Sequence, residues 1–141
     1  MPDIMRLIDD HHAMEQLADR LVATARGDFA QAATCRALMA ALAERVAGHL
    51  MREADFLRGD GQRARPEFAR EVAAFTEAFG HFTESWLAYL GRWSGEGRIE
   101  RDRARYAGET ADIMTALKLR IARENDVVYP LALRTGRIVL A

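Results

Sequence analysis

The sequence predicts an all-α fold, an antiparallel four-helix bundle with up-down-up-down connections, and three observations support this prediction. Ala, Leu, Arg and Glu are abundant, and the alternation of polar and apolar residues that is typical of strands is absent. Apolar residues recur with a helical period over four long segments. The connections between these segments are short, which favours antiparallel neighbours.

The bounds of the four helices follow from Pro, Gly and charged residues along the chain. The first helix is expected at about 2–26, with Pro2 and Asp3 as start signals, and the second at about 28–57, ending in "RGDGQRAR". The third begins at Pro66, a residue favoured in the first turn, and covers 66–93. The segment "SGEG" then breaks the chain before a fourth helix at 99–134.

Length and composition indicate one soluble domain. The chain has 141 residues, so we expect one domain over 1–141 with a short apolar tail at 135–141. Apolar residues make up 50%, charged residues 29%, and the net charge is -1, so no global field attracts nucleic acid or a membrane surface. No segment has the roughly 18 consecutive apolar residues of a membrane span, and the N-terminus is too polar for a signal peptide. The single Cys35 fits a reducing compartment, and we expect a cytoplasmic protein.

Three of the helices carry polar residues on their apolar stripes when each residue is placed at 100° per step. These inward residues are His11, His49, Glu53, Arg120 and Glu124, with Glu15 at the edge of the first stripe. An unpaired carboxylate in a core is costly, so the inward acids need a metal, another cation or a proton.

The third helix leaves two arrangements open. Its strongest stripe is aromatic and consists of Phe68, Val72, Phe75, Phe79, Phe82, Trp86, Tyr89 and Trp93. His81 lies about 130° from the centre of this stripe, together with Glu77. Either the aromatic stripe is the core and His81 is at the surface, or His81 faces inward and the aromatic residues form a second surface, such as a homodimer interface.

Antiparallel connections bring the polar residues toward one level of the bundle. His11 is near the start of its helix, the pair His49 and Glu53 and the residue Glu124 are late in theirs, and His81 is midway. His49 and Glu53 are four residues apart, so both side chains can reach one centre. Imidazole and carboxylate donors inside a helical bundle suit iron or manganese.

The sequence resembles the hemerythrin-like, or HHE cation-binding, family over nearly its whole length. The matching segments are "DDHHAMEQLADRL" with His11, "HLMREADFL" with His49 and Glu53, "GHFTESWLAYL" with His81, and "LRIARENDVVYPLA" with Glu124. The resemblance implies a hemerythrin-like bundle whose metal ligands are His11, His49, Glu53, His81 and Glu124. It implies iron, as one or two ions, with manganese or zinc as alternatives.

One position departs from the family pattern. Arg120 stands where the family has a fourth-helix His that holds one of two irons bridged by the two Glu residues, and Arg does not ligate metals. The second metal is therefore in question. Arg120 is expected as a counter-charge for Glu53 or Glu124, and Glu15 or Glu77 are additional candidates for the missing ligand.

The resemblance implies binding or sensing of dioxygen, nitric oxide or redox state, or iron handling, rather than catalytic turnover. The alternative is a bundle that has lost its metal, holds no cofactor and acts in protein interaction or regulation, since Arg120 can neutralise the inward acids. A hydrolytic or oxidative enzyme has little support, because Ser/His/Asp ordering, a Gly-rich phosphate loop and CxxC are all missing. The Arg-rich segments also contain acids, which is typical of a solvated face rather than of nucleic-acid binding.

Overall fold

The computed structural model describes residues 4–27, 31–58 and 66–134, and every regular element within these ranges is helical. The all-α prediction is therefore confirmed for this part of the chain. The predicted apolar tail 135–141 lies outside the described residues, and so does the side chain of Phe68, a member of the predicted aromatic stripe. Within the same ranges, none of the helices combines the length and the apolar character needed to cross a bilayer.

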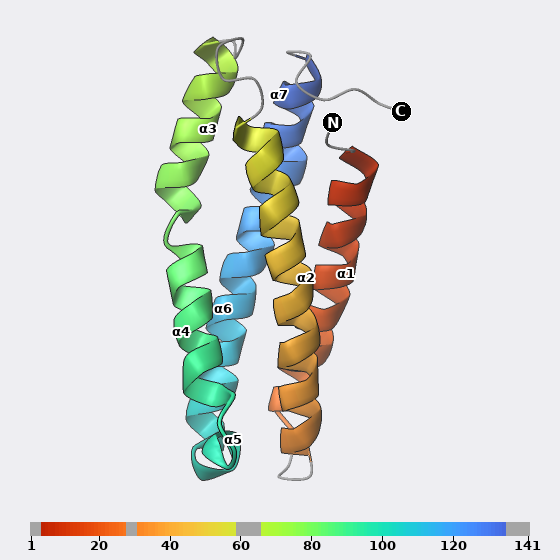
Figure 1. The fold of residues 1–141 in the computed structure, drawn as a ribbon. Coiled ribbons are helices and arrows are strands. Elements are labelled where there is room, and N and C mark those ends of the chain that lie inside the picture. Colours follow the sequence, from red (N-terminus) through yellow and green to blue (C-terminus); the bar gives the residue numbers. More distant parts are fainter. Residues whose placement is uncertain (1–3, 28–30, 59–65, 135–141) are drawn as a thin grey trace.

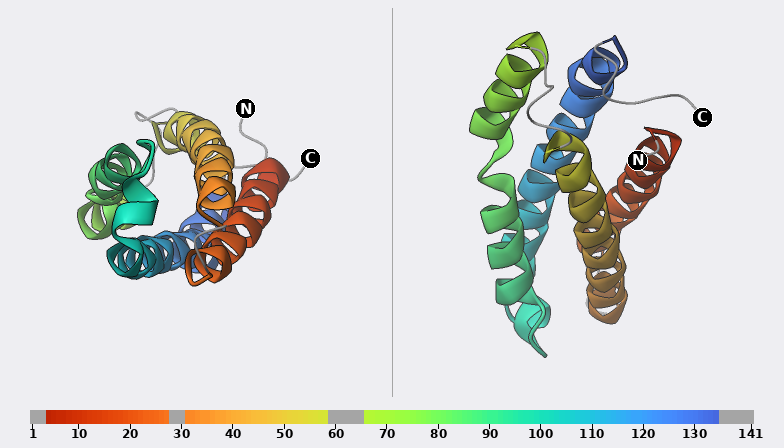
Figure 2. Two further views of the ribbon diagram at one scale, coloured as in Figure 1. Left: turned by 90° about the horizontal axis from the view of Figure 1, so that it is seen from below. Right: turned by 45° about the horizontal axis from the view of Figure 1, so that its top comes forward.

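The helices lie side by side around a common interior (Figures 1 and 2). In chain order they are α1 (Ile4–Ala25), α2 (Ala32–Arg58), α3 (Pro66–Phe79), α4 (Phe82–Trp93), α5 (Arg98–Arg101), α6 (Arg103–Arg123), a π-helical turn (Glu124–Val128) and α7 (Tyr129–Arg134). α1 packs against α2 and α6, and α4 packs against α6. In Figure 1, α4 continues the course of α3, and α7 continues that of α6.

The single helix predicted over 66–93 is interrupted, and the interruption is at Gly80. α3 ends at Phe79, and the N–H of Gly80 donates to the carbonyl oxygen of Thr76 at 2.7 Å. A Cβ at position 80 would lie 2.5 Å from that same oxygen, so the backbone approach leaves no room for a side chain. His81 follows in the turn, and α4 begins at Phe82.

The fourth predicted helix, 99–134, is also divided. Gly97 has a φ of 77°, a left-handed conformation that suits Gly, and it precedes the short helix α5. Asp102 leaves the helical conformation and its carbonyl accepts from the N–H of Tyr106, so that α6 starts anew. Near the other end, the π-helical turn widens the backbone just before Pro130. Pro130 has no N–H, and in a regular α-helix its ring would clash with the carbonyl four residues earlier, which accounts for the widening.

The aromatic stripe of α3 and α4 is part of the core, so the first of the two arrangements is confirmed. Its buried members are Phe75, Phe82, Trp86, Tyr89 and Trp93, and Val72 and Phe79 are half-buried. The side chain of His81 is 90% exposed. Wherever their side chains are described, α3 and α4 therefore present no exposed aromatic face, the surface that the other arrangement assigned to a homodimer.

Two hydrophobic clusters fill the interior, one on each side of the polar residues. The larger cluster includes Met14, Val46 and Ile121, and the smaller one includes Leu7 and Val128. Along α1, His11 falls between Leu7 and Met14, and Glu124 falls between Ile121 and Val128. The polar residues thus form one layer that divides the apolar core.

Candidate metal centre

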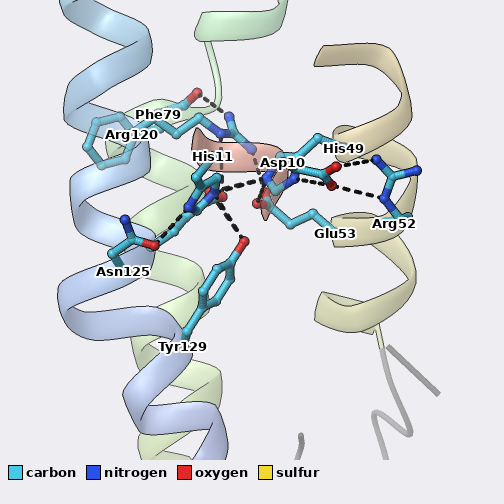
Figure 3. Close-up of polar contacts among 10 residues, drawn as sticks. Asp10, His11, His49, Arg52, Glu53, Phe79, Arg120, Asn125 and Tyr129 are labelled. Carbon is cyan, nitrogen blue, oxygen red and sulfur yellow. Dashed lines mark hydrogen bonds and ion pairs between the residues drawn. The ribbon is translucent and has the colours of Figure 1, made fainter. Parts of the chain in front are cut away.

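Four buried side chains from three parts of the chain meet in this layer. They are His11 of α1, His49 and Glu53 of α2, and Glu124 at the start of the π-helical turn, each no more than 3% exposed. Each offers a ligand atom, and these four atoms lie within 4.8 Å of one another. The structure therefore brings together four of the five residues that the sequence predicts as the main metal ligands. Figure 3 shows His11, His49 and Glu53 turned toward one another.

The distances within the cluster are short. Nε2 of His11 lies 2.6 Å from Oε1 of Glu124 and 3.2 Å from Nε2 of His49. Nε2 of His49 in turn lies 3.1 Å from Oε2 of Glu53 and 3.4 Å from Oε1 of Glu124. Both imidazoles therefore present the same nitrogen, Nε2, to the same small space.

The other nitrogen of each imidazole is held by an acceptor. Nδ1 of His11 donates to Oδ1 of Asn125 at 2.8 Å, and Nδ1 of His49 donates to Oδ2 of Asp10 at 3.0 Å. Asp10 is itself held by Arg52 through two hydrogen bonds of 2.9 and 2.7 Å. A hydrogen on Nδ1 leaves the Nε2 lone pair free for a metal, which is the usual arrangement of metal-bound His.

Neutral imidazoles in these tautomers leave four lone-pair donors facing one another, which is favourable only with a cation or a proton between them. Protonation of His11 is disfavoured, because burial and the neighbouring His49 lower its pKa to about 4. Burial opposes ionisation of Glu53, but hydrogen bonds and charges from His49 and Arg120 outweigh it and lower the pKa of this carboxyl. Two imidazoles and two carboxylates match the ligands of iron, manganese or zinc, so the residues present fit a metal ion.

Arg120 occupies the side of the cluster that faces α3 and α4. Its Nη2 donates to Oε1 of Glu53 at 2.8 Å, and its Nη1 donates to the carbonyl of Phe79 at 3.3 Å (Figure 3). That carbonyl is at the C-terminal end of α3, where the helix leaves its last carbonyls unpaired. The guanidinium also lies over the rings of Phe75 and Phe82, at 4.9 and 5.9 Å from the ring centroids.

Three of the sequence-predicted candidates are not in the cluster. His81 is in the turn between α3 and α4, and its Nδ1 lies 3.4 Å from Oε2 of Glu84 at the surface. It points outward because the aromatic stripe of the same helices is buried. Glu77 is exposed on α3, and Glu15 is half-buried on α1, outside the group of four.

Three residues that the sequence analysis did not single out contact the cluster. Asp10 and Asn125 hold the two imidazoles, and the hydroxyl of Tyr129 lies 3.3 Å from Nε2 of His11. At 100° per residue, Asn125 and Tyr129 do not share the face of Glu124. The π-helical turn changes this register, and the only sign of it in the sequence is Pro130 in a helical segment.

A surface cavity of about 610 Å³ lies along α4 and α6 but does not contain the cluster. Its lining residues include His81, Phe82, Ser85, Ala88 and Ala116. None of the four clustered residues lines it. The candidate site is therefore the buried polar layer and not this cavity.

One of three comparisons with known proteins found a match. Searches of curated proteins and of solved structures returned no match. The model of the hemerythrin HHE cation-binding domain matches residues 3–132, which include every residue of the buried cluster. The chain belongs to the hemerythrin HHE cation-binding family.

Proposed function

We propose that this protein binds a single iron ion through His11, His49, Glu53 and Glu124, and that Arg120 takes the place of a second metal. The position of the two carboxylates carries this proposal. Glu53 directs Oε2 toward His49 and Oε1 toward Arg120, at 3.1 and 2.8 Å. Glu124 directs Oε1 toward His11 at 2.6 Å, while its Oε2 lies 3.7 Å from Nε of Arg120.

Each carboxylate therefore has one oxygen for the metal and one for the guanidinium. In the family pattern the corresponding Glu residues bridge two irons. The permanent positive charge of Arg120, at the place of the second iron, balances part of the carboxylate charge but binds no ligand. We infer one iron per chain, because Arg120 stands at the fourth-helix His position and His81, the remaining candidate imidazole, is exposed.

A bound iron supplies an electrophilic, redox-active centre. Because the four protein donors are buried, a small molecule such as dioxygen or nitric oxide is the kind of ligand that could reach a bound ion. We propose binding or sensing of such a diatomic molecule, or of redox state, as the role of the site. We also propose that the helices form the up-down-up-down four-helix bundle of the family, which the packing of α1 on α2 and of α4 on α6 supports.

Metal analysis of protein produced in iron-supplemented cells tests the proposal. The expected result is one iron per chain in the wild type and a loss of iron in His49→Ala. His81→Ala is the matched control, since this His is exposed, and it should retain the iron. Nitric oxide added to the Fe(II) protein should change its electron paramagnetic resonance spectrum. A wild type without metal, or a His49→Ala variant with unchanged iron, overturns the proposal.

A second candidate function follows from the same arginine. Arg120 is held by Glu53, by the Phe79 carbonyl and by two aromatic rings, so it can stabilise the buried carboxylates without a metal. The chain would then be a metal-free bundle that acts in protein interaction or regulation. Stable protein that contains no metal, together with an Arg120→His variant that gains iron, would favour this function.

A further inference from the structure

Tyr129 places its hydroxyl at the edge of the buried cluster. The oxygen lies 3.3 Å from Nε2 of His11 and 3.5 Å from Oε1 of Glu124, two of the four proposed donor atoms. The phenol ring is stacked on the imidazole of His11, with centroids 5.4 Å apart and planes 8° apart. The side chain is 2% exposed, and Figure 3 shows it directed into the cluster.

The π-helical turn is what brings Tyr129 to this position. In an α-helix, residues five apart are separated by about 140° around the axis, so Tyr129 would point away from the face of Glu124. Here the N–H of Tyr129 donates to the carbonyl of Glu124, the i to i−5 bond of a π-helix, and both side chains reach the cluster. Such single π-turns in α-helices are frequent at functional sites.

The spacing of the hydroxyl matches that of the proposed ligands. With metal–donor distances of about 2.1 Å, adjacent donors of an octahedral site lie about 3.0 Å apart. The four proposed donors have separations of 2.6, 3.1, 3.2 and 3.4 Å along the cluster. The separations of 3.3 and 3.5 Å from the Tyr129 oxygen are close to this range.

We propose that the phenol oxygen of Tyr129 is a fifth ligand of the metal bound by His11, His49, Glu53 and Glu124. This inference rests on the proposed function and specifies its site as two imidazoles, two carboxylates and one phenolate. The phenol proton passes to solvent when the metal binds, as ligand protons generally do.

Spectroscopy of the iron-loaded protein tests this assignment. The purified chain is loaded with Fe(II) under anaerobic conditions and then oxidised with dioxygen to Fe(III). A phenolate ligand to Fe(III) produces a visible charge-transfer band and enhanced phenolate ring modes in the resonance Raman spectrum. The wild type should show both, and Tyr129→Phe should lose both while it retains its iron.

Tyr89→Phe is the matched control. Tyr89 is buried in α4, and its hydroxyl contacts Thr110, away from the cluster. This variant should keep the charge-transfer band. If Tyr129→Phe does not fold, the Raman spectrum of the wild type still decides, because an iron-loaded protein without phenolate modes overturns the inference and leaves the proposed function intact. A band that persists in folded Tyr129→Phe also overturns it. A wild type that takes up no iron overturns the proposed function, and the inference with it.

Discussion

Arg120 and Glu53 form a buried ion pair across the bundle. Nη2 of Arg120 lies 2.8 Å from Oε1 of Glu53, and the two side chains are 12% and 3% exposed. The other oxygen of this carboxylate faces His49, so one Glu links the arginine to the proposed metal ligands. Because a buried charge requires a partner, this pair affects both the stability of the bundle and the metal stoichiometry of the site.

Arg120→Gln should therefore destabilise the metal-free protein strongly. Removal of one partner of a buried pair leaves an uncompensated charge and costs about 3 to 5 kcal/mol. Urea unfolding measures the change in the free energy of unfolding. Arg123→Gln is the control, since Arg123 pairs with Glu71 at the surface and such pairs contribute less than about 1 kcal/mol. If the two substitutions changed the free energy of unfolding equally, the larger contribution expected of the buried pair would be contradicted.

Asp10→Asn should weaken metal binding while the fold is retained. The Asp10 carboxylate orients His49 through Nδ1 and increases the basicity of its Nε2. Loss of such a partner typically lowers metal affinity by about 10- to 100-fold. Competition with a chelator measures the affinity. Asp9→Asn is the control: it changes the neighbouring exposed carboxylate and should leave the metal affinity unchanged. If Asp10→Asn also binds metal with the affinity of the wild type, the Asp10 carboxylate does not have this role.

The stability of the metal-free protein should depend on pH through His11. Burial lowers its pKa from 6.5 to about 4, so between these values the unfolded state binds more protons than the folded state. The free energy of unfolding should fall as the pH falls from 6.5 to 4, by on the order of 3 kcal/mol from this group. Thermal unfolding of wild type and His11→Gln across this range isolates the contribution. His12→Gln, at an exposed position, should behave like wild type.

Two glycine substitutions should change stability in opposite directions. Gly80→Ala places a Cβ against the Thr76 carbonyl and should lower the free energy of unfolding by more than about 1 kcal/mol. Gly108 is exposed inside α6, and a Cβ there meets nothing within 4 Å. Gly108→Ala should raise the free energy of unfolding by about 0.5 to 1 kcal/mol. Chemical denaturation of both variants checks the prediction, and a stabilised Gly80→Ala would refute the proposed close approach.

Helical periodicity was enough to predict four members of the buried cluster. His11, His49, Glu53 and Glu124 lie on the apolar stripes of regular helices, where the angle per residue is constant and the inward face can be calculated. The same calculation did not decide which face of the third helix is buried, because one face carries the aromatic stripe and the other carries His81. Burial of Phe82 and Trp86 decided in favour of the aromatic face, which left His81 in solvent.

The sequence by itself determined the all-α class, the family resemblance and the inward carboxylates, since these depend on local propensity and on a regular helical repeat. The tertiary structure alone decided which groups surround the carboxylates. The break at Gly80 exposes the carbonyl that Arg120 binds, and the π-helical turn carries Tyr129 to the cluster. Asp10 and Tyr129 act on side chains 39 and 118 residues away along the chain. Contacts of this kind depend on how separate helices pack, and no repeat within one helix predicts them.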